Sequence, residues 1–353
     1  MWKWQFLCWL IRTLSWGDKQ RQRRFSRLYN EVLKELEYTQ DRWVTHNFRL
    51  KDPPAPAETS GPSTPIALVM QGKLMKEQSF TLKTIRHYRR VFPGSLLIVS
   101  TWRDEDPALL KELEEAGARI VLSAPPEFPG PSHVNYQIRS TLAGIEAARV
   151  AGHEYVLKTR ADVRMYASGI SDYLLALHRS FPVAHGYGQR GRLLALDLAT
   201  RTFIPQHPSD IMMFGLTEDL FAYWNTPFCE EPREATRHNY QGFGELINSV
   251  IPEVYLCRQY LNRLGYSHEP TIANWWRCLA DLFLVVDRMS LEHFWYKYDY
   301  VVEHQSEPDA QRRNSALCTF RDWLAISTFD KQPTIKIEQL LPQAFHAPLP
   351  DAA

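Results

Sequence analysis

Three cations and one carboxylate lie within the last seven residues of the segment Tyr155–Arg164. The segment begins with apolar residues that suit a buried strand, and then places Lys158, Arg160, Asp162 and Arg164 on alternate positions. In open α/β sheets, ligands bind beyond the carboxyl ends of such strands. Because a charge is costly to bury without a partner, this pattern favours a site for a phosphate ester, with or without a metal ion. The alternative is a solvated loop of mixed charge.

The composition narrows the class of protein. The chain of 353 residues is long enough for one large domain or two smaller ones. A net charge of +1 argues against nucleic acid as a partner of the whole chain, so any site for a polyanion must be local. The five cysteines form no CxxC pair and the twelve histidines form no HExxH or HxxxH pair, which favours reduced thiols in a cytoplasmic protein over disulfides or a zinc site.

Residues 1–52 are predicted to form a helical arm that is rich in tryptophan and basic residues. Tryptophan beside clustered Arg and Lys is typical of a helix on an anionic membrane surface, which the sequence indicates for residues 1–24. The alternative is that Trp2, Phe6 and Trp9 pack on the protein's own core. No apolar stretch approaches the ~20 residues that cross a bilayer, and a signal peptide is disfavoured because a small-residue cleavage site is absent.

A linker rich in proline and serine, residues 53–65, is the predicted boundary of the main domain, residues 66–290. Within that domain, short apolar runs alternate with amphipathic stretches, in units of about thirty residues that predict a parallel sheet with right-handed crossovers. Strands are expected at 66–70, 96–100, 119–122, 155–159, 193–198, 211–214 and 281–287, and helices at 77–92, 107–116, 134–148, 171–180, 217–224 and 251–264. Residues 291–353 are treated as a C-terminal extension.

Two common nucleotide-binding motifs are absent from the sequence. No G-x-G-x-x-G follows the first predicted strand, and no Walker A motif occurs. A dinucleotide oxidoreductase and a P-loop kinase are therefore disfavoured. Nucleotide-sugar transferases and nucleotidyltransferases remain as the leading classes for a sheet of this kind.

Several short motifs follow one another between residues 65 and 265, namely Val69-Met-Gln-Gly72, Thr84-Ile-x-x-Tyr88 with Phe92-Pro93, Ser100-Thr-Trp102, Asn135-x-Gln137 with Ser140-Thr141 and Gly144, Lys158-Thr-Arg-x-Asp162, Ser209-Asp210 and Pro252-Glu253. In this order they resemble the WavE lipopolysaccharide-synthesis family of bacterial surface polysaccharides. The resemblance implies a GT-A-like (Rossmann-like), mostly parallel α/β sheet flanked by helices. It also implies transfer of a sugar from a nucleotide donor.

In a GT-A-like sheet the donor nucleotide lies over the carboxyl ends of the first strands. Gly72 would let the backbone approach the base or ribose, and Gln71 offers both a donor and an acceptor to the base. The alternative for this pair is a turn glycine beside an exposed glutamine. Thr101 and Trp102 end the second strand, where Trp102 either stacks on the base or packs in the core. These four residues are candidates for donor binding.

The next helix adds two candidates for the donor. Asn135 and Arg139 lie near its start, where backbone amides favour anions, so Arg139 is a candidate to meet the diphosphate. An ordinary surface arginine is the alternative.

Lys158, Arg160 and Asp162 occupy the place of the Asp-x-Asp motif of GT-A enzymes, in which the second acid typically binds a divalent cation. Here Arg160 replaces the first acid. Asp162 alone is a weak site for Mg²⁺ or Mn²⁺, although such ions often use one or two carboxylates plus substrate phosphates. Arg160 and Lys158 are therefore candidates to neutralise the diphosphate directly, and Asp162 either holds a metal, holds the ribose hydroxyls or orients Arg160.

Transfer with inversion at the sugar needs a general base. Asp210, just before a predicted strand, is the first candidate, as base or as ligand of the acceptor. Glu253, beside Pro252 at a helix start, is the second. Each has a structural alternative, because Asp210 suits a turn or cap and Glu253 suits the first turn of a helix dipole.

The sequence thus predicts a cytoplasmic glycosyltransferase, peripheral on the inner face of the inner membrane. The expected substrates are a nucleotide-sugar and a lipopolysaccharide core or related lipid-linked glycan. One rival is a sugar nucleotidyltransferase, for which Gln71-Gly-Lys73 is only a faint version of a glycine-rich basic loop. The other is a non-catalytic scaffold of polysaccharide assembly, which would explain Arg160 in place of an acid.

Overall fold

The computed structural model describes residues 65–183, 187–232, 240, 242–297 and 317–328, together with eight separate positions among the first 28 residues. The chain divides into two units, Met1–Pro53 and Pro54–Ala353. The eight described positions of the first unit are all helical, and Phe6 stacks there on Trp9. The basic residues Arg12, Lys19, Arg21 and Arg23 and the linker up to residue 64 lie outside the described residues. Within the described part of the chain, no helix combines the length and the apolar character that a bilayer crossing requires.

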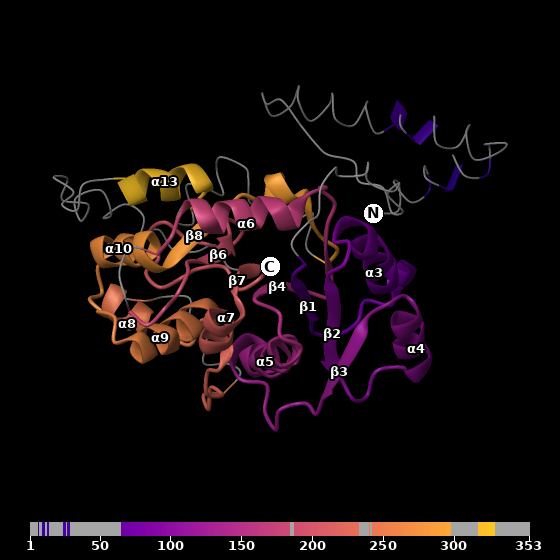
Figure 1. Ribbon diagram of the computed structural model, residues 1–353, viewed down its shortest axis with the longest axis horizontal. Helices are drawn as coiled ribbons and strands as arrows, with labels where there is room; N and C mark the ends of the chain where they lie inside the picture. The colour runs from indigo at the N-terminus through magenta and orange to yellow at the C-terminus, as the bar shows by residue number, and fades with distance from the viewer. Residues whose placement is uncertain are drawn as a thin grey trace. The chain divides into compact units, whose positions relative to one another are not determined.

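A seven-stranded sheet forms the centre of the second unit, in the order β3-β2-β1-β4-β7-β6-β8 (Figure 1). Six strands run parallel and β7 runs against both of its neighbours. The strands are β1 (Ala67–Gln71), β2 (Leu96–Trp102), β3 (Arg119–Ser123), β4 (Tyr155–Arg160), β6 (Leu193–Leu196), β7 (Met213–Leu216) and β8 (Phe283–Val286). The prediction of a mostly parallel sheet flanked by helices is confirmed. Most of these strands are buried along their whole length, as expected for a sheet covered on both faces.

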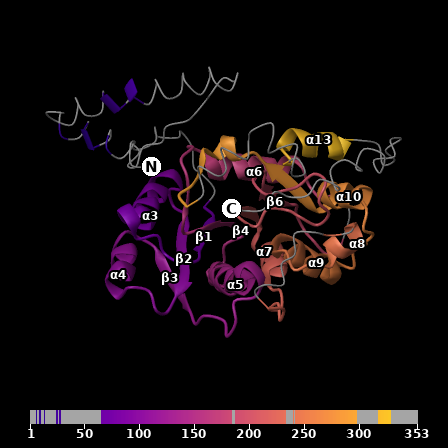
Figure 2. The same cartoon turned by 180° about the vertical axis from the view of Figure 1, so that it is seen from behind.

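Helices cover both faces of the sheet. In both views α5, α7 and α9 lie on one side, and α6 and α13 lie on the other (Figures 1 and 2). The helices are α3 (Phe80–Val91), α4 (Pro107–Glu115), α5 (Val134–Val150), α6 (Ile170–Ser180), α7 (Thr217–Trp224), α8 (Phe243–Ile247), α9 (Pro252–Leu264), α10 (Ile272–Leu282) and α13 (Phe320–Thr328), with single 3-10 turns at Glu77–Ser79, Pro131–His133 and Arg288–Leu291. Gly144 lets α5 approach β1 closely, because a Cβ there would stand 2.4 Å from Val69 Cγ1.

The structure departs from the sequence-based elements in three places. A short strand, β5 (Val163–Met165), pairs with β9 (His293–Trp295) in a separate two-stranded sheet, and three residues are too few for a periodic signal. Helix α10 continues through Leu282, so the predicted strand at 281–287 is shorter than expected. Helices α8, α10 and α13 were not predicted, although Thr271 caps α10 by accepting from the Asn274 amide at 3.1 Å.

Several polar candidate residues lie along the side of the sheet that holds the carboxyl ends of the parallel strands, which we call the carboxyl edge. Parallel strands end there, so Gln71 of β1 stands beside Arg160 of β4 in register. Because β7 is antiparallel, the residues that precede it lie at the same edge, and this brings Asp210 to the end of β4. Helix α9 then begins at Pro252, which places Glu253 near the same edge.

Candidate active site

Arg160 and Asp162 form a bidentate ion pair at the end of β4. The Arg160 Nε and Nη2 atoms donate to the two carboxylate oxygens of Asp162 at 2.9 and 3.2 Å. The Trp295 indole donates to the same carboxylate at 3.0 Å, and the Arg160 guanidinium lies over the Trp295 ring at 5.1 Å. Burial alone would raise the pKa of Asp162, but the charge and hydrogen bonds of Arg160 and the Trp295 bond together lower it. Asp162 is therefore an anion that orients Arg160.

This arrangement does not fit a divalent cation at Asp162. Both carboxylate oxygens already accept hydrogen bonds from Arg160 or Trp295. A metal ion there would also stand against the Arg160 guanidinium. No cluster of three or more His, Cys, Asp or Glu side chains suited to a metal occurs in the described residues. Arg160 itself supplies the positive charge at this position.

Lys158 lies two residues earlier in β4 and is fully buried. Its ammonium donates to the Asp210 carbonyl oxygen and lies 4.6 Å from the centre of the Trp224 ring of α7. Burial lowers the pKa of Lys158 to about 7, and the neighbouring carboxylates of Asp210, Asp162 and Glu253 only partly oppose that change. Lys158 lies inside the strand predicted at 155–159, and Trp224 of α7 packs over its ammonium group.

Glu253 lies in the first turn of α9, with 19% of its side chain exposed. Burial and the charge of Asp210 raise the pKa of Glu253 above its ordinary value, and the cations Arg201 and Arg160 oppose this. Asp210 is only 4% exposed. The two predicted acids therefore lie close enough to influence each other, and Glu253 is the more accessible of the two.

The loop between β6 and β7 completes the cluster. It contributes Arg201 and His207, whose Nε2 lies 3.9 Å from Glu253 Oε2. The indoles of Trp275 and Trp276 in α10 donate to the carbonyls of Arg201 and Thr202 at 2.8 and 2.9 Å. The backbone is strained within this loop, with φ of 72° at Ala199 and 60° at Gln206. Strain of this kind is often found at functional sites.

The candidates at the ends of the first two strands differ in how firmly the protein holds them and in how open they are to a ligand. The Gln71 amide oxygen accepts from the Ser140 hydroxyl at 2.8 Å, which ties Gln71 to α5. Gly72 has φ of 105° and open space where a Cβ would stand, so a ligand can approach its backbone. Thr101 is buried and its hydroxyl lies 3.4 Å from Glu105 Oε1. Trp102 is 7% exposed, with its ring edge-on to Tyr136.

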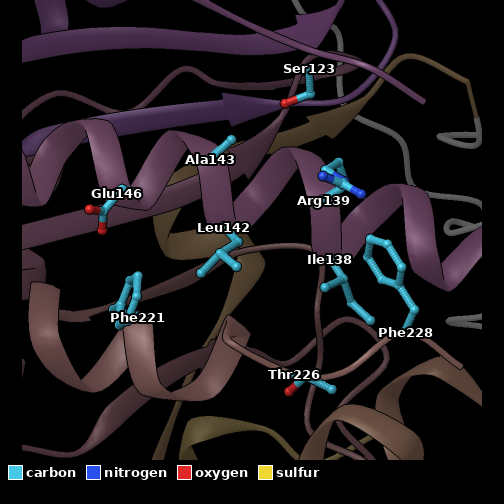
Figure 3. Close-up of a pocket in the computed structure, with 9 residues that line it drawn as sticks. All are labelled: Ser123, Ile138, Arg139, Leu142, Ala143, Glu146, Phe221, Thr226 and Phe228. Carbon is cyan, nitrogen blue, oxygen red and sulfur yellow. The ribbon is translucent and has the colours of Figure 1, made fainter. Parts of the chain in front are cut away.

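The two candidates on α5 lie apart from the charged cluster. The Asn135 amide exchanges hydrogen bonds with the backbone of Cys229, at 2.8 and 2.9 Å, and thereby anchors the loop after α7. The Arg139 guanidinium lies 4.9 Å from the centre of the Phe228 ring. It lines an open groove of about 570 Å³ between α5 and α7, whose walls include Leu142 and Phe221 (Figure 3). No residue of the charged cluster lines this groove.

The comparisons with known proteins bear on residues 66–274, which match the family described as WavE lipopolysaccharide synthesis over more than half of the chain. The chain belongs to the WavE family. The family resemblance that the sequence motifs indicate is thus confirmed, and this family is one of lipopolysaccharide synthesis. Lys158, Arg160, Asp162 and the other charged residues of the cluster all lie inside the matched range of this WavE protein, whereas Trp295 lies beyond it.

Other comparisons of the WavE chain are less informative. No curated protein matches it. Among solved structures, one similar chain is a protein from Bacillus anthracis assigned as a glucose-1-phosphate thymidylyltransferase and crystallised with sucrose. The two are 9% identical with a TM-score of 0.33, and the alignment covers 76% of this chain and 97% of the other. A likeness this loose carries no argument about function.

Sequence reasoning missed Arg201, His207, Trp224 and Trp295. His207 stands three residues before Asp210 in the sequence, and a lone histidine in a loop has no spacing that signals a role. Trp295 and Asp162 are 133 residues apart, and only the β5–β9 pairing brings them together. The aromatic run at 293–296 was the available signal for that contact.

Proposed function

We propose that this WavE protein transfers a sugar from a nucleotide-sugar donor to a hydroxyl group of a lipopolysaccharide core or related surface glycan. The observation that carries the proposal is the convergence of the Arg160–Asp162 pair with Glu253 and Asp210 at the carboxyl edge of the sheet. Ligands of open α/β sheets bind at this edge. Family membership supplies the biological setting.

The donor is proposed to lie across the ends of β1, β2 and β4. The open backbone at Gly72 is proposed to approach the base or ribose, with Gln71 and Trp102 behind it. The Arg160 side chain is 23% exposed and its Nε and Nη2 atoms are held by Asp162, so we propose that its charge, fixed in orientation, neutralises the diphosphate. Lys158 lies beneath this position and contributes positive charge in its protonated form. The neutralisation of the leaving group then needs no metal at Asp162.

Glu253 is proposed as the general base, and this reverses the order expected from the sequence. A base must reach the proton that it abstracts, and Glu253 is more exposed than Asp210. In the reaction the acceptor O–H bond breaks, the oxygen bonds to the anomeric carbon, and the bond to the diphosphate breaks. The proton moves to Glu253. Its raised pKa makes Glu253 a stronger base than an ordinary glutamate.

We also propose that the protein is held on the inner membrane. A lipid-linked acceptor would require the enzyme to work at the cytoplasmic face of the inner membrane, and residues 1–24 are proposed to hold it there. Deleting residues 1–24 should release the protein from vesicles that contain anionic lipid. Continued sedimentation of the shortened protein with those vesicles would refute the role of the arm.

A panel of nucleotide-sugars and nucleoside diphosphates tests the proposed function. At least one member should raise the thermal unfolding temperature and be hydrolysed slowly, also in the presence of EDTA. Arg160→Gln should weaken that binding about 10- to 100-fold, as expected for a lost charged hydrogen bond. Arg119→Gln, at the opposite end of β3, is the matched control and should bind normally. If no member of the panel binds, the transferase proposal fails. Release of pyrophosphate when the protein is given a nucleoside triphosphate and a sugar phosphate would instead favour the nucleotidyltransferase.

A further inference from the structure

His207 has a defined tautomer. Its Nδ1 lies 2.9 Å from the carbonyl oxygen of Ala199, and a carbonyl oxygen accepts hydrogen bonds but cannot donate them. The Nδ1 atom therefore carries the ring proton, and Nε2 presents a lone pair. Burial and the charge of Arg201 lower the pKa of His207 to about 3, so the ring stays neutral near pH 7.

The lone pair of His207 faces Glu253. The distance of 3.9 Å between Nε2 and Oε2 is too long for a hydrogen bond. A carboxylate and a lone pair repel each other, whereas a carboxylic acid donates to the same lone pair. The contact can therefore close to a hydrogen bond only when Glu253 carries a proton.

The groups around Glu253 come from β4, from α7 and from the loop between β6 and β7, which also leads into β7. Lys158 and Arg160 face it from β4, Asp210 from the approach to β7, Tyr223 from α7, and Arg201 and His207 from the β6–β7 loop. The charge of Asp210 favours the protonated form of Glu253, and the two arginines oppose it. Among these groups, His207 combines neutrality with an acceptor aimed at the carboxyl group.

The loop that carries His207 is held in place by hydrogen bonds within the protein. The Ser209 amide donates to the Thr200 hydroxyl at 2.9 Å, and both tryptophan indoles of α10 hold the carbonyls of Arg201 and Thr202. The ring of His207 is thus fixed at one end by Ala199 and presented to Glu253 at the other. Such support is what a positioned acid–base group requires.

We propose that His207 is a positioning residue that accepts a hydrogen bond from the protonated carboxyl group of Glu253. The proposal rests on the proposed function, because it assigns the fate of the proton in that reaction. When the acceptor hydroxyl loses its proton, Glu253 takes it and donates it in a hydrogen bond to His207 Nε2. No charge moves to the imidazole. Glu253 is thereby stabilised as the acid that the transfer leaves behind.

The test is a titration of Glu253 in the protein without donor, followed by ¹³C NMR of labelled glutamate carboxyl groups and assigned with Glu253→Gln. His207→Asn keeps a donor near the Nδ1 position for Ala199 but removes the acceptor at Nε2, and His207→Phe removes the acceptor while keeping the ring. His207→Gln places an amide oxygen near the position of Nε2. His268→Asn, whose ring contacts Gln206 in the same region, is the matched control.

The Asn and Phe variants should lower the titration midpoint of Glu253 by about one pH unit, because the protonated form loses a hydrogen bond. His207→Gln should stay closer to the wild type, and His268→Asn should match it. An unchanged midpoint in the Asn and Phe variants, or equal shifts in the Asn and Gln variants, would overturn the proposal. Because no donor is present, a failed donor panel and a failed titration are separate results.

Discussion

Two buried cations of the segment Tyr155–Arg164 differ in what surrounds them. Arg164, in β5, donates to the Thr84 hydroxyl at 2.9 Å, the Phe80 carbonyl at 3.1 Å and the Tyr166 hydroxyl at 3.3 Å. Its guanidinium also lies 4.5 Å from the centre of the Phe80 ring. Lys158, in β4, donates to the Asp210 carbonyl oxygen. The carboxylates near it are those of Asp210, Asp162 and Glu253.

The difference separates a cation with structural contacts from a cation within the candidate site. The partners of Arg164 named above are neutral, and they fasten β5 to α3. The neighbours of Lys158 include Asp210 and Glu253, the charge of Asp210 raises the pKa of Glu253, and burial brings the pKa of Lys158 to about 7. A buried group that titrates near neutral pH beside other titrating groups marks a candidate site, whereas burial of a charge alone does not. The following changes test this distinction.

Glu253→Gln should have the largest effect. Loss of the general base should reduce turnover ~10²- to 10⁴-fold with the donor found by the panel. Stability should change in the opposite direction. The raised pKa of Glu253 in the folded protein destabilises it above the unfolded pKa, so the amide should increase the urea midpoint at pH 7 and above. Glu115→Gln, on the exposed face of α4, is the control for both measurements. Turnover close to that of the control would transfer the role to Asp210.

Lys158→Met should change how stability depends on pH. A lysine whose folded pKa is about 7 and whose unfolded pKa is near 10.5 destabilises the fold fully below pH 7, and the penalty disappears as the pH rises to about 10. The variant should therefore gain on the order of 4 kcal/mol over the wild type at pH 6, and progressively less toward pH 10. Urea unfolding at a series of pH values measures this difference. A constant difference across that range would show that Lys158 is an ordinary paired cation.

Arg164→Met should weaken the fold without affecting the site. The Thr84 hydroxyl and the Phe80 carbonyl lose a charged donor, which should cost about 2–3 kcal/mol in the free energy of unfolding. The titration of Glu253 should be unchanged, because none of the contacts named for Arg164 reaches the cluster. Urea unfolding and the carboxyl NMR titration give the two values. A shifted Glu253 midpoint would mean that the two cations are not independent.

The sequence was sufficient for the sheet and for part of the site. The alternation of apolar and amphipathic runs located every strand of the main sheet to within a few residues, because each strand is a local pattern. Lys158, Arg160 and Asp162 are candidates because their charges follow an apolar run, and the antiparallel β7 explains why Asp210 lies near them. The fully buried position of Lys158, and the contacts of His207 and Trp295, depend on chain segments that are distant in sequence, so no local pattern encodes them.

The smallest effect is expected for Trp295→Phe, which removes one donor from Asp162 while keeping an aromatic ring beside Arg160. The folded pKa of Asp162 is lowered, so its contribution to stability is present above the unfolded pKa and is lost as the pH falls through the folded pKa. The free energy of unfolding of the variant should therefore be about 1 kcal/mol below that of the wild type at pH 7. The difference between the two proteins should be smaller at pH 2 to 3. Donor affinity should fall less than for Arg160→Gln, because Arg160 still holds the carboxylate through two hydrogen bonds. If donor binding instead falls as far as in Arg160→Gln, the indole itself contacts the donor, and the site extends onto β9 beyond the matched family range.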